Sequence, residues 1–162
     1  MLPRVACGFH RALPAEITAD FASDFWEKIA PNFLKETVSG AAPRQATWFK
    51  IARDARELRV LFFAEDDDAW ATLTERDAPL YNEEVVEIFL DPFGDLESYF
   101  EIEVNPLNAV CDLVLRRTRS GYKKDFAWNC EGLRTAVKKS AAFWYAERPF
   151  ACCKLSRGAR CF

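Results

Sequence analysis

The sequence is poor in the residues that metal sites and nucleophilic active sites use most often. It has one histidine and one methionine in 162 residues, and its six cysteines include no Cys-x-x-Cys pair. No histidine neighbours a cysteine, so a zinc site is disfavoured. The single histidine, His10, also has no Gly-x-Ser-x-Gly motif to serve, which disfavours a nucleophilic triad.

Long apolar runs and a strong charge of one sign are also missing. The net charge is −3 at pH 7, and acidic and basic residues are interspersed. Without a large basic field, nucleic acid is not an expected partner. No apolar run approaches the roughly 18 residues of a membrane helix, and the apolar stretch within residues 1–13 is too short for a signal peptide. We expect no membrane partner, and no export signal is visible.

What the chain does contain is aromatic and apolar. Half of its residues are hydrophobic and 14% are aromatic, which favours a compact globule over a disordered chain. Short apolar segments bounded by turn residues recur, and few segments have a 3.6-residue period. These patterns predict a mainly β fold, an immunoglobulin-like or jelly-roll-like β-sandwich with short helical turns. The expected strands cover residues 47–52, 58–64, 85–90, 99–105, 110–117, 133–138 and 142–146, and a helical turn is expected within 22–29.

Two neighbouring strands carry carboxylates, and a turn rich in Pro and Gly at residues 91–95 predicts that they form a hairpin. Glu87 lies among strongly apolar neighbours, where an ionised side chain is costly unless a partner binds it. In the next strand, the period of two places Glu101, Glu103 and Asn105 on one face, opposite Phe100, Ile102 and Val104. This polar row is a candidate binding surface.

From Trp48 to about Trp144 the chain resembles the carbohydrate-binding module family 9-like domains. The residues that carry the resemblance are 58–66, 77–81, 84–92 and 99–106, together with Trp128 and 131–133. Members of that family are non-catalytic β-sandwiches found attached to, or near, polysaccharide-degrading enzymes. The resemblance implies a protein that binds an oligosaccharide or polysaccharide of the cellulose or xylan type and has no enzymatic activity of its own. It also implies a linked or separate glycan-degrading enzyme and an extracellular or periplasmic location.

The resemblance further implies which side chains bind the glycan. Tyr81 falls at the position of an aromatic residue that stacks on a sugar ring, and Glu87 matches the glutamate of the following strand. Glu103 and Asn105 match positions whose polar side chains bind sugar hydroxyls. Glu103 departs from the family, because the sugar-binding pattern has an arginine there.

Calcium and the C-terminal region complete these expectations. No cofactor is required, but the resemblance implies structural Ca²⁺, for which Glu65, Asp66 and Asp68 offer hard oxygen ligands. A solvated acidic turn explains the same residues.

The family pattern is lost after Glu147, before its second stacking aromatic residue. We therefore expect a carbohydrate-binding-like β-sandwich domain over residues 1–147, incomplete at its C-terminal end, and an atypical tail over 148–162, as truncation or a frameshift would give.

Three other interpretations remain open. A scaffold or assembly domain without a ligand would account for the missing aromatic residue and for Glu103. A glycoside hydrolase would use two carboxylates, which Glu87, Glu101 and Glu103 could supply. Haem binding in a related sandwich would need axial ligands, for which His10 and Met1 are the candidates.

Overall fold

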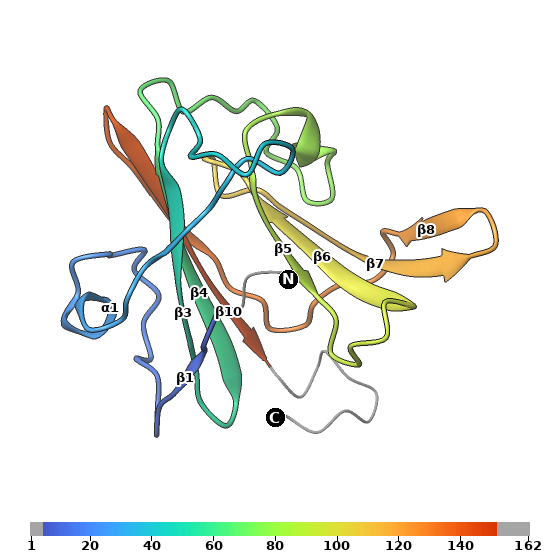
Figure 1. Cartoon of the computed structure of the whole chain (residues 1–162), viewed down its shortest axis with the longest axis horizontal. Coiled ribbons are helices and arrows are strands. Elements are labelled where there is room, and N and C mark those ends of the chain that lie inside the picture. The colour runs from blue at the N-terminus through green and yellow to red at the C-terminus, as the bar shows by residue number, and fades with distance from the viewer. Residues whose placement is uncertain (1–4, 152–162) are drawn as a thin grey trace.

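The computed structural model describes residues 5–151, which form two packed β-sheets (Figure 1). The strands are β1 (Gly8–Phe9), β2 (Asn32–Phe33), β3 (Thr47–Arg53), β4 (Glu57–Glu65), β5 (Val86–Leu90), β6 (Ser98–Val104), β7 (Val110–Thr118), β8 (Gly121–Asp125), β9 (Ala136–Lys139) and β10 (Phe143–Ala151). Sheet A has the order β1-β3-β4-β10-β9, with β2 paired to β3, and sheet B has the order β5-β6-β7-β8. The short helical elements are α1 (Asp24–Glu27) and the 3-10 turn η1 (Leu80–Asn82). The predicted β-sandwich is confirmed.

The predicted β5–β6 hairpin forms, as does a hairpin between β3 and β4, and aspartates stabilise both turns. Between β3 and β4, Asp54 accepts hydrogen bonds from the backbone N–H groups of Arg56 and Glu57, at 2.7 and 2.9 Å. Between β5 and β6, Asp91 accepts from three backbone N–H groups of the turn, and Gly94 adopts a positive φ of 67°. Asp and Gly are favoured in turns because a short side chain can bond its own backbone and glycine tolerates positive φ.

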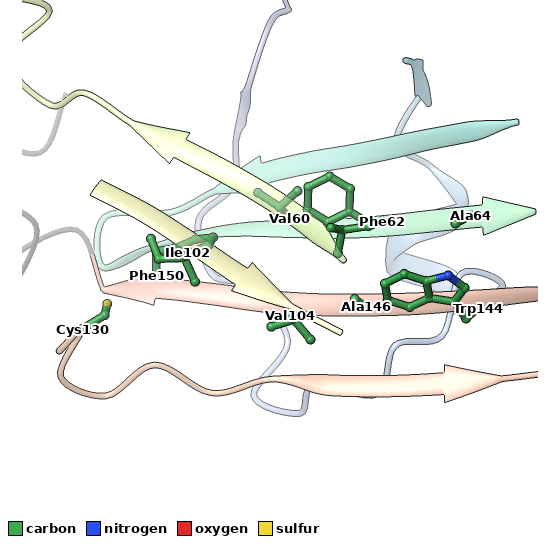
Figure 2. Close-up of a cluster of buried hydrophobic side chains, with 10 residues drawn as sticks. Val60, Phe62, Ala64, Ile102, Val104, Cys130, Trp144, Ala146 and Phe150 are labelled. Atoms are coloured by element: carbon green, nitrogen blue, oxygen red, sulfur yellow. The ribbon is translucent and has the colours of Figure 1, made fainter. Parts of the chain in front are cut away.

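The main core lies between the two sheets. Figure 2 shows side chains of β4 and β10 from sheet A meeting Ile102 and Val104 of β6 from sheet B. This core contains Val60, Phe62, Ala64, Val86, Ile102, Val104, Cys130, Trp144, Ala146 and Phe150. Trp128 packs on Phe100 with 4.6 Å between ring centroids. Trp144 and Trp128 therefore serve packing.

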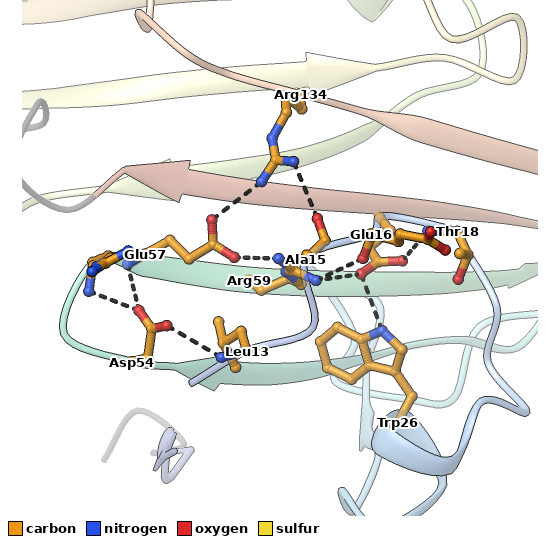
Figure 3. A network of polar contacts seen from close by, with 11 residues as sticks. Leu13, Ala15, Glu16, Thr18, Trp26, Asp54, Glu57, Arg59 and Arg134 are labelled. Atoms are coloured by element: carbon orange, nitrogen blue, oxygen red, sulfur yellow. Dashed lines mark hydrogen bonds and ion pairs between the residues drawn. The ribbon is translucent and has the colours of Figure 1, made fainter. Parts of the chain in front are cut away.

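The outer face of sheet A is covered by the segment that contains α1. Trp26 of this segment is buried and donates a hydrogen bond from its indole N–H to Glu147 at 3.2 Å. Glu147 also accepts from the backbone N–H groups of Thr18 and Ala19, at 3.0 and 2.8 Å, and forms an ion pair with Arg59 at 3.5 Å. Figure 3 shows this network around Trp26, Arg59 and Thr18. A buried carboxylate thus holds the N-terminal segment on sheet A.

The outer face of sheet B is partly covered by the connection between β4 and β5. Leu80 of this connection is fully buried against Cys111, Leu113 and Leu115 of β7, with Leu73 and Ala78 packed around them. Within this connection Trp70 is half exposed, whereas Leu73 is partly buried on the sheet. Apolar residues spaced irregularly in a loop do not show which surface they will cover.

Strand β10 extends further than the sequence indicates. It runs to Ala151, and Arg148 and Phe150 are fully buried. The Arg148 guanidinium lies between the sheets and donates to the backbone carbonyl oxygens of Ile102, at 2.6 Å, and Val86. The expected boundary after Glu147 is therefore corrected for residues 148–151, which continue a sheet A strand. The rest of the expected tail lies outside the described residues.

The sequence also misses β8 and the two-residue strands β1 and β2. β8 has the polar sequence Gly-Tyr-Lys-Lys-Asp, which lacks the alternation of a half-buried strand, and it forms through pairing with β7. Within residues 5–151, no helix combines the length and hydrophobicity needed to cross a bilayer.

Candidate functional site

The candidate site lies on the outer face of sheet B, where the pairing of β5 and β6 brings carboxylates together. Glu87 of β5 is directly opposite Glu103 of β6, and Phe89 is opposite Glu101. Directly paired residues of antiparallel strands point to the same face. The predicted alternation of β6 is confirmed, because Ile102 and Val104 enter the main core while Glu101 and Glu103 point away from it.

Glu87, Glu101 and Glu103 form a compact group, which we call the acidic triad. Each offers a carboxylate oxygen, and the three oxygens lie within 4.8 Å of one another. Glu103 is fully buried and Glu101 is 6% exposed, whereas Glu87 is half-buried. Among the residues that the structure describes, neither carboxylate oxygen of Glu103 has a hydrogen-bond partner. Such a group is costly to bury unless something compensates its charge.

The titration of the acidic triad reflects this crowding. Burial raises the pKa of Glu103 to about 8, and a hydrogen bond between the protonated carboxyl group and Glu101, together with the charges of Glu87 and Glu101, adds to the rise. The lack of a partner for the Glu103 oxygens therefore refers to the ionised form, which finds no N–H or hydroxyl donor among residues 5–151. Burial also raises the pKa of Glu87, again with a contribution from Glu101. The positive charge of Lys124 opposes both shifts. A proton or a cation that neutralises part of the triad is therefore favoured near neutral pH.

Tyr81 lies beside this face and is linked to it through Lys124. The Tyr81 ring is 47% exposed on η1, and the Lys124 ammonium nitrogen is 4.9 Å from the ring centroid. Lys124 belongs to β8 and pairs with Leu115, on the same face as the triad. The structure thus brings an exposed aromatic ring, a cation and carboxylates to one side of sheet B.

Asn105 is in the predicted row, but its amide is used within the protein. It is fully buried, donates to the Leu73 carbonyl oxygen at 2.7 Å and accepts from the N–H groups of Leu107 and Ala109, at 3.1 and 2.9 Å. These bonds fix the β6–β7 turn and attach the covering loop to sheet B. Asn105 thus has a positioning role within the protein, and its predicted contact with a ligand stays a prediction.

The acidic turn predicted to bind calcium is arranged differently from the acidic triad. Glu65 accepts from the Ala46 N–H at 3.1 Å, and Asp66 accepts from the Gln45 amide and the Asp68 N–H, at 3.3 and 2.9 Å. Within residues 5–151, the acidic triad is the one group of three His, Cys, Asp or Glu residues whose ligand atoms lie within 4.8 Å. Glu65, Asp66 and Asp68 do not meet that spacing, and calcium there stays a prediction.

Glu84 is an acidic neighbour of this turn that the sequence analysis passed over. Burial raises its pKa to about 7, and the adjacent Asp66 carboxyl adds to the rise. Glu84 also accepts from the Trp70 N–H at 2.9 Å and lines a cavity of about 450 Å³ with Glu65 and Asp66. Its position two residues before β5 gave no signal of this proximity.

Sequence reasoning also missed a row of aromatic side chains across sheet B. Phe89 and Tyr122 are 54% and 44% exposed. Tyr99 lies between them, with ring centroids 5.9 Å from Phe89 and 5.2 Å from Tyr122. All three share the face of the triad by strand pairing. For Phe89 and Tyr99 the signal was available, since each lies two residues from a triad glutamate on a predicted strand.

His10, the candidate haem ligand, serves packing. Its ring makes an edge contact with Phe25, at 5.2 Å between centroids. Met1, the other candidate, lies outside the described residues.

The fold is shared with solved carbohydrate-binding structures. A carbohydrate-binding module family 9 protein from Caldicellulosiruptor kristjanssonii in complex with glucose superposes with a TM-score of 0.63 at 20% identity, covering 95% of this chain and 71% of that one. Its complex with cellotriose gives a TM-score of 0.62 at 20% identity, with coverages of 90% and 67%. A candidate carbohydrate-binding protein from Bacteroides uniformis gives 0.74 at 13% identity, with coverages of 96% and 77%. No family model and no curated protein sequence matches the chain. The chain therefore has a carbohydrate-binding module family 9-like fold.

Proposed function

We propose that the outer face of sheet B binds a saccharide and that the protein performs no catalysis. The observation that carries this proposal is the meeting of Tyr81, Lys124 and the acidic triad on one face. A sugar presents C–H groups on its flat faces and hydroxyls at its edges, so it needs an aromatic surface with hydrogen-bonding groups beside it. The likeness of the fold to structures that hold glucose and cellotriose supports the same conclusion.

In this proposal Tyr81 stacks on the sugar ring, and Glu87, the most accessible triad member, accepts hydrogen bonds from hydroxyl groups. Asn105 acts indirectly by holding the covering loop. Affinity would be modest, with dissociation constants in the micromolar to millimolar range, because one aromatic contact and a few hydrogen bonds supply roughly 4 to 8 kcal/mol. Glucans and xylans are the glycans to test first. The module would hold the glycan for a linked or separate degrading enzyme.

The geometry argues against a glycoside hydrolase. Retaining and inverting enzymes separate their two carboxyl groups by about 5 to 5.5 Å and about 6.5 to 9.5 Å, so that a sugar and water fit between them. In the triad, Glu101 and Glu103 are buried, and one oxygen of each of the three carboxyl groups lies within 4.8 Å of the others. The triad therefore does not offer a glycosidic bond two accessible, separated carboxyl groups.

Calorimetry tests the proposal. Cello- and xylo-oligosaccharides titrated into the full chain should release heat, and Tyr81→Ala should lose it while its far-UV circular dichroism spectrum stays unchanged. Phe33→Ala is the matched control, because Phe33 is 67% exposed but lies on β2 of sheet A. Equal loss in both variants, or no heat with any oligosaccharide, would favour a scaffold without a ligand.

A further inference from the structure

Glu103 of the acidic triad is a buried carboxyl group that forms no ion pair among residues 5–151. Glu103 is fully buried, and no N–H or hydroxyl donor among residues 5–151 bonds its carboxylate oxygens. The contact left to it is a proton shared with the Glu101 carboxyl group. One of its oxygens lies within 4.8 Å of oxygens from Glu87 and Glu101, so this group faces two further carboxylates. An isolated buried carboxylate is destabilising, and three that converge repel one another.

The charges of Lys124 and Arg148 act on the triad, but neither side chain forms an ion pair with it among the described residues. Lys124 is exposed and lies over the Tyr81 ring, and no ion pair joins it to the triad within the described residues. The Arg148 guanidinium lies behind the sheet and bonds the carbonyl oxygens of Ile102 and Val86. The triad thus has three acidic groups, with the nearest cations held by other contacts.

We propose that Glu87, Glu101 and Glu103 together bind a Ca²⁺ ion on the outer face of sheet B. Carboxylate oxygens are hard ligands, which suit Ca²⁺, Mg²⁺ and Mn²⁺ better than softer metals. Three oxygens within 4.8 Å of one another can surround an ion at the calcium–oxygen distance of roughly 2.3 to 2.6 Å. The three side chains come from two paired strands whose spacing is fixed. Ca²⁺ tolerates such an imposed arrangement, whereas Mg²⁺ requires a near-ideal octahedron and releases water reluctantly.

Glu87 is the triad member nearest to solvent, on the edge strand β5. Glu87 is half-buried and, with Phe89 and Lys35, lines a cavity of about 530 Å³ at that edge. Ca²⁺ takes about six to eight oxygen ligands, so monodentate binding by three carboxylates leaves positions for water or for sugar hydroxyls. Coordination of sugar hydroxyls rests on the proposed function above, whereas binding of the ion itself does not.

Titration of CaCl₂ into chelator-treated full chain, followed by isothermal calorimetry, tests the site without a saccharide. We expect one ion per chain with a dissociation constant of about 10⁻⁴ to 10⁻³ M, weaker binding of MgCl₂, and at least tenfold weaker Ca²⁺ binding in Glu103→Gln. Glu97→Gln is the control, because Glu97 is an exposed glutamate of the β5–β6 turn.

Two results would overturn the proposal. One is unchanged Ca²⁺ affinity in a folded Glu103→Gln, and the other is loss of Ca²⁺ binding in Asp66→Asn but not in Glu103→Gln, which would place the ion at the acidic turn. Glu103→Gln removes a buried charge at nearly constant shape, so its folding is expected to survive, and unfolding by urea checks this. Oligosaccharide titrations with and without Ca²⁺ form a separate arm. If the protein binds saccharide but not Ca²⁺, only the proposed ion site is rejected. If it binds Ca²⁺ but no saccharide, only the proposed saccharide binding is rejected.

Discussion

Glu147 on the outer face of sheet A and Glu103 on the outer face of sheet B are both buried glutamates, with 1% and 0% of their surface exposed. Glu147 accepts hydrogen bonds from two backbone N–H groups and the Trp26 indole, and it pairs with Arg59. Glu103 has no such donor among the described residues and faces two other carboxylates. Burial is therefore equal, but the neighbouring donors differ. A carboxylate that its neighbours satisfy stabilises the fold, whereas one left without donors is the basis of the proposed ion site.

The largest expected change in stability is at Glu147, the buried glutamate whose carboxylate is hydrogen-bonded. Glu147→Ala removes the acceptor of a buried network and leaves Arg59, which is 1% exposed, without that partner. Breaking a buried ion pair from one side lowers the free energy of unfolding by about 3 to 5 kcal/mol. Urea denaturation measures this loss. Glu97→Ala, which breaks the exposed pair with Arg117, should stay close to the parent. A similar small change in Glu147→Ala would show that the network adds little stability.

Asn105 extends the comparison to sheet B, because it lies beside the triad but has its hydrogen bonds satisfied. Asn105→Ala leaves the Leu73 carbonyl oxygen and two N–H groups without their partner. We expect a loss of about 1 to 3 kcal/mol in the free energy of unfolding, and faster hydrogen exchange at Ala109. Asn82→Ala, at an exposed position of η1, is the control. If stability is unchanged while saccharide affinity falls, Asn105 contacts the ligand directly.

Glu103→Gln should act in the opposite direction from Glu147→Ala. In chelator at pH 8 it removes an unsatisfied charge, which should raise the free energy of unfolding by about 1 to 3 kcal/mol. The folded protein raises the pKa of Glu103 from 4.5 to about 8, chiefly through burial. The folded state therefore binds this proton more tightly than the unfolded state, and the parent should lose stability as pH rises between these values. Plots of the free energy of unfolding against pH for the parent and for Glu103→Gln should therefore converge at low pH. Plots that stay parallel would show that Glu103 has an ordinary pKa in the folded protein.

The smallest expected effect concerns the aromatic row. Phe89→Ala should weaken binding of cellotriose by a few-fold and leave glucose binding nearly unchanged, because a longer ligand reaches further across sheet B. An aromatic contact of this kind supplies about 0.5 to 1.5 kcal/mol. Parallel calorimetric titrations with the two sugars measure the difference. Equal weakening for both would place Phe89 beside the same sugar ring as Tyr81.

The sequence predicts the strands of this fold better than it predicts the state of the site residues. Alternation along 99–105 correctly separates the core residues Ile102 and Val104 from Glu101 and Glu103. It gave no sign that the Asn105 amide would donate a hydrogen bond to the carbonyl oxygen of Leu73, which lies 32 residues earlier. It also did not show that Arg148 would continue β10 into the core. Alternation reports which way a side chain points, but not what covers it.

The amino-acid sequence by itself determined the β-sandwich, its two main hairpins and the placing of carboxylates on one strand face, because strand periodicity and turn chemistry are local. The tertiary structure alone decided that Glu87, Glu101 and Glu103 converge and that Glu103 has no described donor. It also decided that Tyr81 joins them through Lys124. These relations depend on the pairing of distant strands and on a loop that covers sheet B, and a buried charge acquires its cost from those surroundings.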